Sequence, residues 1–188
     1  AHGRGVEKND KEAVRWYRLA AKQGDSTAQF VLGSMIANGQ GVEKNDKEAV
    51  LWYRLAAEQG HAKAQFNLGF MIANGQGVEK NENEAVRWYR LAAEQGHATA
   101  QFNLGCTIAN GQGVEKNDTE AVRWYRLAAK QGDSTAQFVL GSMISNGQGV
   151  EKNVNEALRW YRLAAEQGHA KAQFNLGFMI KNGQGVEK

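Results

Sequence analysis

The sequence contains no proline, and this absence argues against proline-rich linkers and favours unbroken helices. Cys106 is the only cysteine, so an intramolecular disulfide is impossible. The net charge of +3 comes without any run of like charges typical of a nucleic-acid-binding tail. No apolar stretch approaches the roughly 18 residues that a membrane-spanning helix needs. The composition therefore predicts a soluble globular protein that does not insert into a membrane.

The sequence also lacks the apolar core of a signal peptide. It begins in the middle of a repeated motif, so export from a bacterium, with a leader absent from these residues, stays open. The single cysteine does not indicate a redox compartment either, and the cellular location is left unknown.

A period of 36 residues runs through the chain. Its markers are Trp16, Trp52, Trp88, Trp124 and Trp160, with glycines such as Gly33, Gly69, Gly105, Gly141 and Gly177 in the same phase. Residues 12–36 also recur without change at 120–144. A fixed period of this size is typical of stacked supersecondary units. The repeat predicts one solenoid over residues 1–188, built from about five helix pairs and forming a segment of a longer array.

Each repeat is predicted to hold two helices. In residues 44–60 an apolar face combines small and aromatic side chains at helical spacing: Ala49, Trp52, Tyr53, Ala56 and Ala57. Asn45 and Glu48 have the spacing of a reciprocal capping box, and Arg54 is expected on the solvated side. The second helix, over 62–74, is apolar around most of its girth, as in a helix sandwiched between neighbours.

The loop "NGQGVEKN" at 74–81 ends each helix pair. Gly75 and Gly77 are expected to adopt positive φ and turn the chain sharply. A phosphate-binding loop is disfavoured, because the loop follows a helix and lacks the Lys-Ser/Thr of that motif. Gly69, inside the second helix, suggests that two helix axes approach closely there.

These residues resemble the Sel-one-like repeat family, a relative of the tetratricopeptide repeats. The similarity covers essentially the whole chain and includes Ala64, Gln65, Leu68, Gly69, Ile72, Gly75, Gly77, Val78, Ala85, Trp88, Tyr89, Ala92, Ala93 and Gly96. The resemblance implies an all-α fold, a right-handed α/α superhelical solenoid, and a role as an adaptor or scaffold in protein complexes.

The sequence predicts no catalytic, metal-binding or cofactor-binding site. His61, His97 and His169 start second helices where other copies carry Asp25 and Asp133, which indicates helix capping. Cys106 has no identifiable base beside it, as a nucleophile would need. The Trp-Tyr pairs have the spacing of core residues, and the few lysines do not form an RNA-reading groove. We therefore expect no nucleic-acid partner.

The copies differ mainly along one stripe of the second helix, at positions i, i+4 and i+7, with a constant phenylalanine beside it. Inner helices of stacked repeats usually line a concave binding wall. The predicted partner-binding residues are Lys63, Phe66, Asn67, Phe70, Thr99, Phe102, Asn103, Cys106, Thr135, Phe138, Ser142, Lys171, Phe174, Asn175 and Phe178.

Two alternatives apply to this stripe: the constant phenylalanines pack against the next repeat, or the variation is surface drift. For the whole protein, the leading hypothesis is a non-enzymatic scaffold that binds a protein or peptide. An enzyme or carbohydrate-processing accessory, and a structural spacer without a ligand, are the other hypotheses. End-to-end self-association is expected from apolar faces at the ends.

Overall fold

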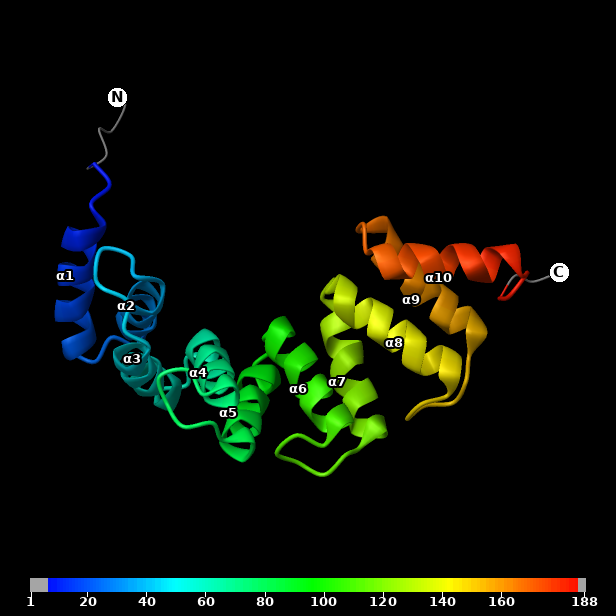
Figure 1. Ribbon diagram of the computed structural model, residues 1–188, viewed down its shortest axis with the longest axis horizontal. Helices are drawn as coiled ribbons and strands as arrows, with labels where there is room; N and C mark the ends of the chain where they lie inside the picture. Colours follow the sequence, from blue (N-terminus) through cyan, green and yellow to red (C-terminus); the bar gives the residue numbers. More distant parts are fainter. Residues whose placement is uncertain (1–6, 186–188) are drawn as a thin grey trace. The chain divides into compact units, whose positions relative to one another are not determined.

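The computed structural model describes residues 7–185, and these form α-helices without any strand. The predicted array extends to residues 1–6 and 186–188, which lie outside the described residues. The helices, coloured along the chain in Figure 1, are α1 (Asp10–Lys22), α2 (Ser26–Asn38), α3 (Asp46–Glu58), α4 (Ala62–Asn74), α5 (Glu82–Glu94), α6 (Ala98–Asn110), α7 (Asp118–Lys130), α8 (Ser134–Asn146), α9 (Val154–Glu166) and α10 (Ala170–Lys181). The predicted all-α repeat solenoid is confirmed.

The residues fall into two compact units, divided between Leu91 and Ala92 inside α5. In the first unit α1 packs on α2, α2 on α3 and α3 on α4. In the second unit α6 packs on α7, α7 on α8, α8 on α9 and α9 on α10. Each unit is therefore built by contact between helices that follow one another along the chain.

Helix ends are set by short-range hydrogen bonds. Asn45 caps α3, because its side chain accepts from the Glu48 amide at 3.0 Å. The reciprocal half of the predicted capping box is wrong: the Glu48 carboxylate instead accepts from Arg18 and from the Trp52 indole. His61 caps α4 by accepting from the Ala64 amide at 3.2 Å, which confirms the capping role.

The core combines alanine, valine and tyrosine side chains of the first helices with alanine, leucine, isoleucine and methionine side chains of the second helices. Ala56 of α3 and Leu68 and Ile72 of α4 are completely buried. Gly69 lies against the Tyr89 ring, and a Cβ added there would come within 3.0 Å of a ring carbon. The close approach predicted at this glycine is confirmed.

Tryptophan departs from the predicted core role. Tyr53 is buried, whereas Trp52 is only half-buried and Trp16 is exposed. The indole lies at the edge of the apolar face, where the Nε1–H of Trp52 can donate to Glu48 at 3.2 Å. Its polar edge keeps this side chain at the surface while the tyrosine beside it enters the core.

Arg54 was expected on the solvated side, but it is half-buried and donates to Glu84 of the next repeat at 2.8 Å. The second unit repeats this pair as Arg126 and Glu156. Burial alone would raise the pKa of Glu84, but hydrogen bonds from Arg54 and Trp88, with the charge of Arg54, outweigh it and lower the pKa.

This lowered pKa predicts acid sensitivity. A carboxyl whose pKa is lowered by folding stabilises the fold above its unfolded pKa, and this contribution is lost as pH falls through the folded pKa. When the pH is lowered from neutral to below 4.5, the ordinary pKa of a glutamate, the free energy of unfolding of the wild type should decrease. We expect a smaller decrease in the Arg54→Met variant, because it lacks the charge that lowers the pKa of Glu84. Urea unfolding at several pH values measures this, with Lys63→Met as the control. Equal pH dependence in all three proteins would contradict the prediction.

Candidate functional site

The variable stripe of the second helices lies at the surface, with half-buried or exposed side chains in the described copies. In α4, Lys63 is exposed, Asn67 is half-buried and Phe70 is 43% exposed. The same pattern holds in the second unit at Thr99, Asn103, Cys106, Thr135, Ser142, Lys171, Asn175 and Phe178, which are all half-buried or exposed. Within each unit these side chains are therefore accessible to a partner.

The constant phenylalanines behave differently. The Phe66 ring lies 5.9 Å from the Tyr89 ring of the next repeat, centroid to centroid. Equivalent contacts join Phe102 to Tyr125 at 5.7 Å and Phe138 to Tyr161 at 5.9 Å. These contacts agree with the alternative given in the sequence analysis, in which the constant phenylalanine rings pack against the next repeat. Phe66, Phe102 and Phe138 are half-buried, whereas Phe174 is 73% exposed.

The first unit has a hollow of about 310 Å³ on the stripe, between α2 and α4. Phe70 forms an apolar wall, and Asn67 and Ser34 supply polar groups on the two helices. Lys44 of the loop after α2 and Asp46, the first residue of α3, also line the hollow and form an ion pair of 3.6 Å. The hollow thus combines one exposed ring with several hydrogen-bonding groups.

Tyr53 of α3 also lines this hollow and reaches it between the two second helices. Burial raises the pKa of the Tyr53 hydroxyl, although hydrogen bonds with Asn67 and Ser34 act in the opposite direction. The hydroxyl therefore stays protonated and can donate a hydrogen bond. We did not predict Tyr53 as a site residue, and the signal available was a constant tyrosine beside variable positions 34 and 67.

Cys106 occupies the same stripe position in α6. Burial raises the pKa of its thiol, and the Asp133 charge acts in the same direction, while a hydrogen bond with Tyr125 partly opposes them. A thiol with a raised pKa is mostly protonated and a poor nucleophile at neutral pH. The surroundings of Cys106 are those of a packing residue.

Metal ligands do not gather in the part of the chain that the structure describes, because no group of three His, Cys, Asp or Glu side chains there could hold an ion. The imidazoles of His61, His97 and His169 instead cap their own helices. Among residues 7–185, no helix has the length and apolar character to cross a bilayer.

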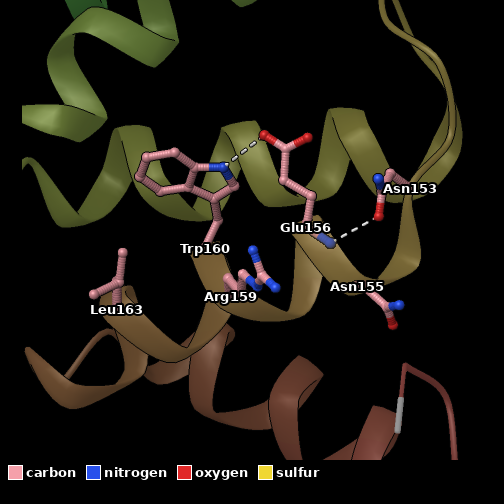
Figure 2. A pocket seen from close by; sticks show the side chains of 6 residues that line it. All are labelled: Asn153, Asn155, Glu156, Arg159, Trp160 and Leu163. Carbon is pink, nitrogen blue, oxygen red and sulfur yellow. Dashed lines mark hydrogen bonds between the residues drawn. The ribbon is translucent and has the colours of Figure 1, made fainter. Parts of the chain in front are cut away.

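A second hollow, of about 590 Å³, lies on α9. Figure 2 shows the Trp160 indole donating to Glu156, at 3.2 Å, with Arg159 and Leu163 beside it. Glu156 also receives a charge-assisted bond from Arg126. Its carboxylate is thus held by structural contacts that repeat along the chain, and this arrangement gives no acid–base pair.

A family model described as Sel1 repeat matches residues 1–25, 26–61, 62–97, 98–133, 134–169 and 170–188. Each complete match begins at a second helix and ends just after the following first helix. The comparison with curated proteins found no match.

Solved structures of bacterial proteins resemble the chain along its length. The c5321 protein of uropathogenic Escherichia coli, a protective antigen with an SLR fold, is 40% identical with a TM-score of 0.94. The chain is covered to 98% and spans 40% of that protein. A Sel1 repeat protein from Oxalobacter formigenes is 43% identical with a TM-score of 0.84, covering 99% of this chain and 74% of its own.

Helicobacter pylori cysteine rich protein B is more distant, at 25% identity and a TM-score of 0.57, covering 73% of this chain and 99% of its own. The family match covers the chain from end to end, the repeat boundaries agree with the helix pairs, and two structures share at least 40% of the residues. The chain therefore belongs to the Sel1 repeat family.

Proposed function

We propose that the chain is a non-catalytic scaffold that binds a protein or peptide segment along the stripe of its second helices. Sel1 repeat proteins generally mediate protein–protein interactions and are typically non-catalytic. The observation that carries the proposal is the hollow of about 310 Å³ at Tyr53, Asn67 and Phe70, which lies on the stripe where the copies differ most.

The chemistry of the hollow suits a peptide. An apolar side chain of the partner would lie against the Phe70 ring, which is exposed in the unbound protein and loses its contact with water on binding. The Asn67 amide both donates and accepts, so it can bond to a partner backbone. The Tyr53 side chain is buried behind the hollow, and its hydrogen bonds with Asn67 and Ser34 help to position these two groups.

The lysines on the second helices favour a partner segment of opposite charge. Lys63 is exposed on the same helix as Phe70, and Lys171 occupies the equivalent position beside Phe178. Lysines at the rim of an interface steer association more than they strengthen it. We therefore infer a partner segment that combines an apolar anchor with acidic neighbours.

Selection from a displayed random-peptide library on the intact chain tests this proposal. We expect the selected peptides to combine an aromatic or aliphatic residue with acidic residues, and Phe70→Ser to weaken their binding about tenfold. The substitution is expected to cost little stability, because Ser34 and Ser142 occupy the same position in folded copies. Fluorescence anisotropy and thermal melting measure the two effects.

Leu55→Ser is the matched control, since Leu55 has a similar exposed fraction, 44%, but lies on the first helix α3. Its peptide affinity should be that of the wild type. If Leu55→Ser weakens binding and Phe70→Ser does not, the binding site lies on the first helices. If the library yields no binder, the structural-spacer hypothesis is favoured.

A further inference from the structure

The second helices begin with two kinds of capping residue. α2 and α8 begin after aspartates, whereas α4, α6 and α10 begin after histidines. In α8 the Asp133 carboxylate accepts from the Ala136 amide at 2.8 Å. In α4 the Nδ1 atom of His61 accepts from the Ala64 amide at 3.2 Å. An imidazole nitrogen that accepts a hydrogen bond carries no proton, so His61 makes this contact in its neutral form.

The His61 ring is held in place by its surroundings. It stacks on the Phe30 ring of α2, with the ring centroids 4.7 Å apart and an interplanar angle of 22°. The second unit repeats this arrangement, because His169 stacks on Phe138 at 4.8 Å and caps α10. The His61 backbone amide donates to the Ala56 carbonyl of α3 at 3.1 Å. His61 thus joins the start of α4 to both preceding helices.

The groups around His61 disfavour a positive charge on its ring. Burial lowers the pKa of the imidazole, and the charge of Lys63 on the same helix acts in the same direction, while a hydrogen bond with the backbone of His61 opposes them. α2 presents the uncharged Phe30 ring, and Glu58 at the end of α3 is exposed to solvent. The face of an aromatic ring attracts a cation weakly, but it supplies no acceptor for the Ala64 amide.

From these contacts we propose that His61 is a pH-sensitive cap, which releases the first turn of α4 when it becomes protonated in weak acid. Both ring nitrogens of an imidazolium carry hydrogen, so turning the ring restores no acceptor. Its positive charge would also lie at the helix end that favours negative charge. Carboxylates generally become protonated only near pH 4, so α2 and α8 should keep their first turns in weak acid.

The pH range of the switch follows from the direction of the pKa change. A histidine whose pKa is lowered by folding stabilises the fold fully above its ordinary pKa of 6.5, and this contribution is lost as the pH falls through the folded pKa. Glu84 responds only at lower pH, because folding lowers its pKa from 4.5. Since α4 carries Asn67 and Phe70, the switch acts on one wall of the hollow in the first unit.

Solvent-exchange NMR of single amides tests this proposal on the 188-residue chain. The Ala64 amide of α4 is compared with the Ala136 amide of α8, and each exchange rate is divided by its intrinsic rate at the same pH. From about pH 7.5 to about pH 5 we expect the protection of Ala64 to fall about fivefold, as is typical of a lost helix cap. The protection of Ala136 should stay constant over the same range.

His61→Asn is the matched variant, because asparagine caps a helix about as well as aspartate does and has no titratable group. The protection of Ala64 should then be the same at both pH values. Asp133→His makes the reverse change, and Phe102 precedes position 133 by the same interval as Phe30 precedes His61. This variant should transfer the pH dependence to the start of α8.

The proposal is overturned if the protection of Ala64 in the wild type does not depend on pH, if Ala136 loses protection to the same extent, or if His61→Asn shows the same fall. It is also overturned if a folded Asp133→His protein gains no pH dependence at α8. Should that variant not fold, the wild type and His61→Asn still distinguish a histidine cap from a general effect of acid on the chain.

Discussion

Gly77→Ala is expected to destabilise the folded chain by about 3 kcal/mol, with two separate causes. Gly77 has a φ of 69°, in the left-handed region that a side chain disfavours. A Cβ at this position would also lie 2.3 Å from the backbone carbon of Asp46. The loop would have to move away from the start of α3 to accept even a methyl group. Chemical unfolding measures the change.

Gly75→Ala in the same loop separates these causes. Its φ of 66° is nearly the same, but the nearest atom to an added Cβ is Cβ of Lys80 at 3.4 Å, an ordinary contact. We therefore expect a loss of about 1 kcal/mol, from the backbone conformation alone. Equal losses in the two variants would show that the approach to Asp46 is unimportant.

Gln137→Met is expected to destabilise the second unit by about 2–3 kcal/mol. Gln137 is buried, and its Nε2 donates to the Ala129 carbonyl at 3.1 Å, which ties α8 to α7. Its Oε1 accepts from Gln167 of the next repeat at 2.7 Å. Methionine keeps the length of the side chain but makes neither bond, and it leaves the Ala129 carbonyl without this donor. Thermal unfolding measures the loss.

Gln173→Met provides the control in a similar sequence context. Gln173 donates to the Ala165 carbonyl at 3.1 Å, but its side chain is exposed, so water can replace the bond. The loss should be less than half of that for Gln137→Met. A similar loss in both variants would mean that burial does not determine the strength of this bond.

Periodicity predicted the helix pairs and the positive φ of Gly75 and Gly77, because both depend on short-range geometry. It did not predict the role of Gln137, since a polar side chain in a repeat is indistinguishable from a surface residue until the neighbouring helices are placed. The same limit applies to Glu48: its spacing from Asn45 suggested a reciprocal cap, but Arg18 and Trp52 compete for the carboxylate.

The candidate site was only partly predictable, for a similar reason. The variable stripe could be found by comparing copies, and its side chains do lie at the surface of each unit. Helical spacing alone could not tell Phe66 from Phe70, although one ring packs on Tyr89 and the other stays exposed. Tyr53 was missed because it belongs to a first helix, α3, and lines the hollow between the two second helices α2 and α4.

The identity of residues 12–36 and 120–144 has a consequence at the level of the gene. An exchange between two misaligned copies would insert or delete whole multiples of 36 codons, since equivalent positions are separated by that interval. Each new junction would join helix faces that already contact each other in this chain, such as those of α2 and α3 or of α8 and α9. Such alleles should encode folded proteins of different lengths, whereas a deletion of half a period would bring together two faces that have no counterpart in the chain.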